Sequence, residues 1–334
     1  MTPFENIQSP ITGASSGRVA VLSWNIRLVN DEVIFTYGHH MALLLKSHLE
    51  KHGANDFVLI VYENKTKPQE CWHLMKNILE TVLRRKIEGS WVGLGGDSYT
   101  RENVLWFASS GVIVSHEIRD VIDFAEIATA EFIQVQKQLA LDHAAGVSDY
   151  NLRRNRACPY LPSESPSVEA WRGIAVFGVR IRGCVNVVNI GAIHAPGPGW
   201  QDYVDRVLGT GSAISVYLST AIGLDLDILL GDFNVRDNIN WEEAGFEQPF
   251  LGDEGSTYGN DGYTRGSTLW DRYLIRRGFD SCEVTGTLVD QVKENVDLQG
   301  ASDHLILSCI ITTPGPLPNG NHNLTEIDDE KADG

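Results

Sequence analysis

The sequence lacks the features of a disulfide-stabilised, zinc-binding or membrane-spanning chain. It has five cysteines among 334 residues, an odd number with no Cys-x-x-Cys pair. Neither a disulfide framework nor a zinc site is therefore expected, and the thiols are expected to be reduced. No apolar run approaches the about 20 residues that cross a bilayer, so we expect no membrane-spanning segment.

Recognisable targeting segments are also missing. Residues 1–17 are polar, with Pro, Asn and Ser, and lack the apolar stretch of a signal peptide. We expect them to form a flexible lead and the protein to be cytoplasmic, with export by another route left open. Residues 313–334 are rich in Pro, Gly and Asn and end in acidic residues, which predicts a disordered tail. Without an internal repeat or a linker, residues 18–312 are expected to form one domain.

Positive charge is scarce. The chain carries 27 Lys and Arg against 44 Asp and Glu, a formal net charge of -17. No overall basic field draws it to nucleic acid or to an anionic membrane, although a local basic patch beside a bound divalent metal can still hold a phosphate. The dense basic patch is Arg153, Arg154 and Arg156, in a segment that is either a solvated loop or faces the substrate.

Apolar content is sufficient for a large core, at 43% of residues. Apolar runs predict strands at residues 19–24, 57–62, 91–94, 103–108, 174–181, 184–193, 226–230, 269–275, 282–289 and 305–311. Helical spacing predicts helices at 37–52, 68–86, 121–142 and 201–222, and the histidines of the first are expected at the surface. Helices that fall between strands throughout favour one continuous α/β sandwich.

The strand at 226–230 leads into Gly231-Asp232-Phe233-Asn234. Side chains alternate along a strand, so Asp232 and Asn234 point the same way. A carboxylate and a carboxamide that converge at a strand end can hold a hard metal ion, a water or a phosphoryl oxygen. The alternative is a simple turn after a strand, since Asp, Gly and Asn are common in loops.

Other strands place polar residues in the same way. Four apolar strands end in one, namely Asn25, Glu63, His194 and Asp232, and Asp303-His304 begins a fifth. Phosphate ester hydrolysis needs a metal that polarises the phosphoryl group, a base that activates water and an acid that protonates the leaving oxygen. The oxygen ligands of Glu63, Asn25 and Asp303 suit Mg²⁺, and imidazoles exchange protons near neutral pH.

These residues carry a resemblance to a known family. In order and rough spacing the motifs are Trp24-Asn25, Tyr62-Glu63, His194-Ala195-Pro196, Gly231-Asp232-Phe233-Asn234, Trp270-Asp271-Arg272-Tyr273 and Ser302-Asp303-His304. The set resembles the deoxyribonuclease-like endonuclease/exonuclease/phosphatase superfamily, over about residues 18–312. The resemblance implies a four-layer α/β sandwich, two mostly antiparallel sheets packed face to face with outer helices.

The resemblance also implies roles. Glu63 is the main Mg²⁺ ligand, assisted by Asn25 and Asp303, with Mn²⁺ or Ca²⁺ as alternative ions. The residues implied in catalysis are Asp232 for the attacking water, Asn234 for the phosphate, His304 paired with Asp271, and His194 as a second acid/base or phosphate ligand.

A further element resembles the cytolethal distending toxin nuclease-like branch. Arg101 and Asn103 match an Arg-x-Asn element that opens a strand, which implies phosphate contacts, and Arg172 is a similar phosphate-binding candidate. A surface salt bridge is the alternative for either arginine. In deoxyribonuclease relatives a Glu supports the first histidine. Glu102 is the nearest candidate here, and the strand register decides which face it occupies.

Some positions depart from the family pattern. Tyr62 stands where Gln usually precedes the metal-binding Glu, and Trp270 and Arg272 replace the usual neighbours of the dyad aspartate. The departures concern the subfamily rather than the core set.

Three functions follow as hypotheses. The first is a Mg²⁺-dependent phosphodiesterase that acts on nucleic acid, in particular DNA. The second is a phosphatase or phosphodiesterase for a small substrate such as a phosphoinositide or a nucleotide, which the charge of -17 favours. The third is a non-catalytic interaction module of the same fold. The sequence indicates no protein partner.

Overall fold

The computed structural model describes residues 17–26, 30–95, 102–119, 145–146, 173–180, 187–195, 213–234, 241–248, 271–289 and 304–312. All of the expected lead except Gly17 lies outside these ranges, as do the expected tail and the basic patch at 153–156. The predicted helix at 121–142 and the first part of the one at 201–222 also lie outside them. The proposed single domain at 18–312 stays a prediction.

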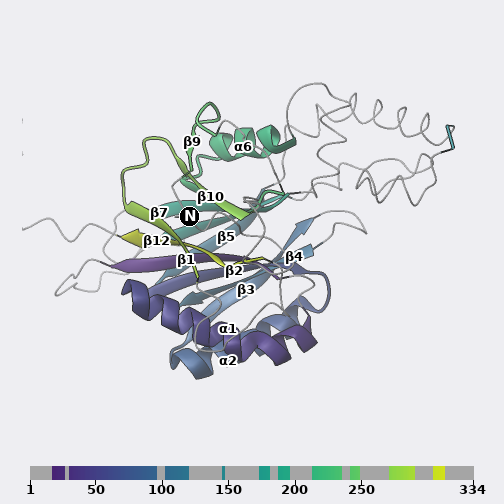
Figure 1. Ribbon diagram of the computed structural model, residues 1–334, viewed down its shortest axis with the longest axis vertical. Helices are drawn as coiled ribbons and strands as arrows, with labels where there is room; N and C mark the ends of the chain where they lie inside the picture. The colour runs from purple at the N-terminus through teal and green to yellow at the C-terminus, as the bar shows by residue number, and fades with distance from the viewer. Residues whose placement is uncertain are drawn as a thin grey trace, which may run out of the picture.

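The described strands form two six-stranded sheets (Figure 1). Sheet A has the order β11 (Glu283–Leu288), β12 (Leu307–Thr312), β1 (Arg18–Asn25), β2 (Asp56–Asn64), β4 (Glu102–Ser109), β3 (Ile87–Gly95). Sheet B has the order β5 (Ile113–Arg119), β6 (Ile174–Arg180), β7 (Val187–His194), β8 (Ile228–Asp232), β10 (Asp271–Arg276), β9 (Phe246–Glu247). The β1–β2 and β7–β8 pairs are parallel and the other pairs are antiparallel.

Helices cover the outer faces of the two sheets. Helices α1 (Asp31–His52) and α2 (Pro68–Leu83) lie together against sheet A, and α6 (Ala213–Gly223) lies on the far side of sheet B (Figure 1). The prediction of a four-layer α/β sandwich with two mostly antiparallel sheets and outer helices is confirmed.

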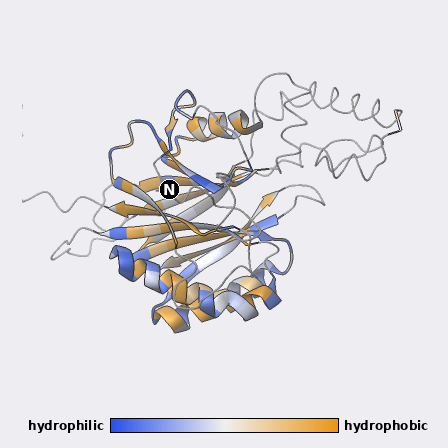
Figure 2. Ribbon diagram, viewed as in Figure 1, coloured by the Kyte–Doolittle hydropathy of each residue, from blue (hydrophilic) through white to orange (hydrophobic). Residues whose placement is uncertain are grey.

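Alternation along β1 shows how the sequence builds two cores. Val19 and Val21 face the core between the sheets, whereas Leu22 and Trp24 face the core beneath α1 and α2. Both faces of the strand are apolar because both are buried. Figure 2 shows the corresponding hydrophobic colour along the central strands, whereas the helices carry both hydrophobic and hydrophilic residues.

Helix α1 begins six residues before the predicted start at Tyr37. Asn30 caps it, since its side chain accepts a hydrogen bond from the Val33 backbone N–H at 2.9 Å. The helix ends as predicted at Gly53, which has a φ of 60°. Helix α2 ends at Leu83, three residues earlier than predicted, because Arg84 adopts the left-handed conformation.

Two further features of the structure differ from the sequence analysis. His48 of α1 was expected at the surface but is buried, and its Nε2 lies 3.0 Å from the Ser308 hydroxyl of β12. Strand β5 was not predicted because Ile113–Arg119 mixes apolar, polar and charged residues without a long apolar run.

Helices able to span a membrane are not found in the described part of the chain. Helix α1 is long enough to cross a bilayer but too polar, and α2 and α6 are too short.

Candidate active site

The candidate site forms where the ends of both sheets meet. Asp232 ends β8 and has a site residue on either side of it in sheet B. It pairs in register with His194 at the end of β7 and with Asp271 at the start of β10. Asn25 ends β1 in sheet A, facing Asp232 across the sandwich. The strand ends therefore bring together residues that are far apart in the sequence.

Asp232 lies at the centre of the site and is almost completely buried. Its Oδ2 accepts a hydrogen bond from Asn25 Nδ2 at 2.8 Å, and its Oδ1 accepts one from the Asn234 backbone N–H at 2.8 Å. The same Oδ2 lies 3.6 Å from His194 Nε2 and 3.9 Å from His304 Nε2. Two imidazoles thus approach one carboxylate oxygen, at distances longer than a direct hydrogen bond.

His304 and Asp271 form a close pair. The Nδ1 of His304 lies 2.7 Å from Asp271 Oδ2, and both side chains are buried. A carboxylate only accepts, so Nδ1 carries the proton and donates it, which leaves Nε2 directed toward Asp232. The contact agrees with the predicted dyad, although its catalytic role stays a prediction.

His194 has an equivalent partner in Glu102. The two Glu102 carboxylate oxygens lie 3.0 and 2.9 Å from His194 Nδ1, and Glu102 is fully buried. The sequence suggested Glu102 as the nearest candidate but did not show which face of its strand it occupies. In the structure, Glu102 lies against His194. The site therefore contains two imidazole–carboxylate pairs, each with Nε2 toward Asp232.

Glu63 reaches the same space from β2. It sits in a bulge between Val61 and Asn64, where the register with β4 shifts, and it has a φ of 64°. Its Oε1 lies 3.9 Å from His194 Nε2, and 22% of its side chain is exposed, against about 2% for Asp232. Glu63 is thus a carboxylate of the site that is open to solvent and to an incoming ligand.

The donor atoms fit a hard divalent cation. Asn25, Glu63 and Asp232 offer oxygen ligands, and several buried carboxylates concentrate negative charge that a cation would offset. Asp303, the third predicted metal ligand, lies outside the described residues. One ligand atom each from Asp232, Asp271 and His304 also lies within 4.8 Å of the others. A hydrogen bond already joins the last two residues, so the dyad accounts for most of this group.

Asn234 is held by the chain that follows His194. Its Nδ2 donates to the Ala195 carbonyl oxygen at 2.8 Å, and its φ of 53° lies in the left-handed region. Gly231 makes this turn possible, because a Cβ there would lie 1.9 Å from the Ile193 carbonyl oxygen. A phosphate oxygen only accepts, so the predicted phosphate contact of Asn234 would need the second hydrogen of this amide and stays a prediction.

The predicted phosphate-binding residues are only partly described. Asn103 lies on β4 beside Glu102, and its Nδ2 donates to the Asn64 carbonyl oxygen at 3.2 Å, next to the Glu63 bulge. Arg101 and Arg172 lie outside the described residues, so their phosphate contacts stay predictions.

Arg272 is a residue that sequence reasoning noted only as a departure. It is buried, lies 5.0 Å over the Trp241 ring and donates to Gln248 Oε1 at 2.9 Å. Burial lowers the pKa of Arg272 to about 10, although the neighbouring Asp271 opposes that shift. It follows Asp271 on β10 and so points to the opposite face, where it supports the strand rather than the substrate.

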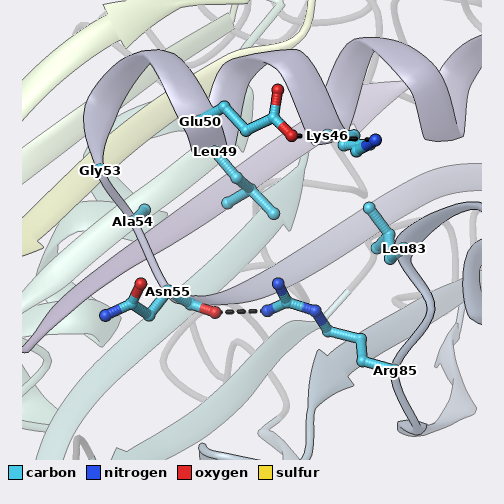
Figure 3. Close-up of a pocket in the computed structure, with 8 residues that line it drawn as sticks. All are labelled: Lys46, Leu49, Glu50, Gly53, Ala54, Asn55, Leu83 and Arg85. Atoms are coloured by element: carbon cyan, nitrogen blue, oxygen red, sulfur yellow. Dashed lines mark hydrogen bonds and ion pairs between the residues drawn. The ribbon is translucent and has the colours of Figure 1, made fainter.

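A separate hollow of about 210 Å³ lies at the other end of β2 (Figure 3). Its polar groups are paired with one another. Lys46 lies 3.8 Å from Glu50, and Arg85 donates to the Asn55 carbonyl oxygen. Asn55 precedes β2, whereas Glu63 lies near the C-terminal end of that strand. The hollow is therefore far from the candidate site.

Comparisons with known proteins agree with this arrangement at the level of fold. No protein-family model matches the sequence, and no curated protein matches it. The solved endonuclease/exonuclease/phosphatase family protein from Leptotrichia buccalis has a TM-score of 0.50 and 11% identity, covering 88% of this chain and 99% of that one. This chain has the endonuclease/exonuclease/phosphatase fold.

Two other solved proteins have slightly lower TM-scores. D. rerio TDP2 complexed with single strand DNA product has a TM-score of 0.49 and 16% identity, covering 89% of this chain and 99% of that one. An endonuclease/exonuclease/phosphatase from Bacteroides vulgatus has a TM-score of 0.48 and 11% identity, covering 89% and 99%. The endonuclease/exonuclease/phosphatase fold places the strand ends together, and the chain's own residues decide which chemistry can occur there.

Proposed function

We propose that the protein is a metal-dependent phosphodiesterase that acts on DNA. The observation that carries the proposal is the convergence of two imidazole–carboxylate pairs on Asp232. His194 and His304 approach the same carboxylate oxygen at 3.6 and 3.9 Å, beside the oxygen ligands of Asn25 and Glu63. Hydrolysis of a phosphoester needs this combination of acid, base and cation ligands.

The metal would be held by Glu63, Asn25 and Asp303, with Mg²⁺ as the expected ion. When bound, it would supply charge that polarises the phosphoryl group. The carboxylate oxygens of this set suit a hard cation better than a soft one. The choice among Mg²⁺, Mn²⁺ and Ca²⁺ belongs to the proposal.

The chain's own groups would divide the proton transfers. Asp232 would orient the attacking water, since Asn25 and the Asn234 backbone N–H fix its two oxygens. His304, held by Asp271, would protonate the leaving oxygen, and His194 would act as a second acid/base or hold a phosphate oxygen. Each supporting carboxylate would hold its imidazole with the proton on Nδ1 and with Nε2 toward Asp232.

A DNA substrate is supported by the Glu102 contact. The expectation from the deoxyribonuclease resemblance was that a glutamate supports the first histidine, and Glu102 lies 2.9 Å from His194 Nδ1. The second candidate, a small phosphorylated substrate, is favoured by the net charge of -17, because a polyanion generally needs several cationic contacts.

Nicking of supercoiled plasmid by the purified protein tests the proposal. We expect nicking with Mg²⁺ and none with EDTA, and a steep loss of DNA affinity as salt rises. A folded protein that leaves the plasmid intact would contradict DNA as the substrate, and phosphate release from nucleotides and phosphoinositides would then be measured. Failure to hydrolyse either class of phosphoester would favour the non-catalytic interaction module.

A further inference from the structure

We propose that Trp24 is a positioning residue for His304. Trp24 is fully buried near the end of β1, and its indole Nε1 donates to the His304 backbone carbonyl oxygen at 3.1 Å. The two residues are 280 positions apart in the sequence. The kinetic test of this inference rests on the proposed function, whereas the contact between Trp24 and His304 is independent of it.

Trp24 acts from outside the site. It faces the core beneath α1 and α2, whereas the next residue, Asn25, faces Asp232 between the sheets. The indole therefore touches neither substrate nor any reacting atom. Its effect on chemistry is transmitted through the backbone of the residue to which it is bonded.

The bond lies next to the paired part of β1 and β12. Strands β1 and β12 pair in register from Arg18 and Thr312 to Ser23 and Leu307. His304 lies three residues before Leu307, and its ring contacts Asp271 in sheet B. A buried carbonyl needs a hydrogen-bond donor, and the Trp24 indole provides one for the His304 carbonyl oxygen.

Two contacts of His304 come from opposite sheets. Asp271 fixes the ring from sheet B at 2.7 Å, and Trp24 fixes the backbone from sheet A at 3.1 Å. If the indole bond is lost, the backbone can move while the ring remains bonded. We expect His304 Nε2 then to leave its place beside Asp232, which weakens proton transfer more than substrate binding.

The chain contains a matched control. Trp72 belongs to the same core, is also buried, and its Nε1 donates to the Trp106 backbone carbonyl oxygen at 3.2 Å. Trp24→Phe and Trp72→Phe therefore each remove one indole donor from one buried carbonyl. The two changes are expected to reduce stability by similar amounts, and only Trp24→Phe affects His304.

The kinetic test uses hydrolysis of bis(p-nitrophenyl) phosphate with Mg²⁺. We expect Trp24→Phe to lower kcat roughly 10- to 100-fold, with KM unchanged within about two-fold. Trp72→Phe should keep kcat near the wild-type value. In a His304→Ala background, Trp24→Phe should cause little further loss, because its effect passes through that imidazole.

A second readout does not need activity. The Nδ1–H of His304 should give a downfield proton signal in the NMR spectrum, assigned by its absence in His304→Ala. Trp24→Phe should shift or broaden this signal, and Trp72→Phe should not. Benzothienylalanine at position 24 keeps the shape of the indole without its N–H, and should reproduce the change if phenylalanine disturbs folding.

These readouts separate the two proposals. A wild-type protein without turnover contradicts the proposed function and leaves the NMR test of Trp24 intact. An unchanged His304 signal and kcat in both position-24 variants overturn the positioning role. Equal kcat losses in Trp24→Phe and Trp72→Phe would also overturn it, since they would indicate a general loss of stability.

Discussion

His194 and His304 each donate Nδ1–H to a buried carboxylate and direct Nε2 toward Asp232. Their supports come from different sheets, since Glu102 begins β4 in sheet A and Asp271 begins β10 in sheet B. At the residue scale, each imidazole is therefore bonded to a carboxylate of the opposite sheet. His194 ends β7 of sheet B and contacts sheet A, whereas His304 precedes β12 of sheet A and contacts sheet B. Displacing either sheet would separate a histidine from its carboxylate.

Glu102→Gln tests the support of His194. The change keeps the shape of the side chain but removes the carboxylate that orients the His194 ring, so we expect kcat to fall about 100-fold with the fold intact. Phosphodiester turnover and the pH–rate profile measure the effect. As a control, Glu80→Gln alters a carboxylate that accepts the Ile87 backbone N–H far from the site, and should leave turnover unchanged. Normal turnover in Glu102→Gln would contradict the role.

The sequence predicted these residues unevenly. Asp232, Asp271 and His304 were predicted because each lies in a short motif that resembles the family pattern. Glu102 could only be suggested, because β4 pairs with β2 and β3 across two register shifts. Each shift changes which face a residue occupies, and no sequence pattern marks it.

At the element scale, β7 and β8 approach closely beneath the site. The parallel pair extends to His194 and Asp232, and Gly231 lies against the Ile193 carbonyl oxygen. The apolar runs predicted both strands. They could not predict the close approach, since it depends on packing between residues about 40 positions apart.

Gly231→Ala should disrupt that approach. Gly231 has a φ of 133°, and the new Cβ would lie 1.9 Å from the Ile193 carbonyl oxygen, so we expect a loss of roughly 3 kcal/mol in the free energy of unfolding. Urea denaturation measures the change. Gly223→Ala at the end of α6 meets nothing within 4 Å and should alter stability by no more than about 1 kcal/mol. Similar losses in both variants would contradict the steric explanation.

Helix boundaries illustrate the same limit at this scale. The apolar spacing predicted α1 from Tyr37, whereas the structure begins it at Asp31. The additional turn depends on the Asn30 cap and on packing of Ile34, which is buried against the helix-side core. Capping is a local contact that a pattern of apolar residues does not reveal.

At the scale of the whole molecule, a chain with a net charge of -17 buries carboxylates at the meeting point of its two sheets. The layered architecture was predictable from alternating strands and helices. The arrangement of the site was predictable only in outline, because it depends on how two sheets pack. An acidic site in an acidic protein is consistent with a reaction that requires a divalent cation.

The most direct test of a hydrolytic site is phosphodiester turnover by three proteins with Mg²⁺. Wild-type protein should hydrolyse bis(p-nitrophenyl) phosphate and stop when EDTA is added. His304→Ala should lose at least about 100-fold in kcat while remaining folded. His48→Ala, which removes a buried histidine bonded to Ser308 away from the site, should retain turnover. A folded His304→Ala variant with a near-normal rate would contradict the proposed site.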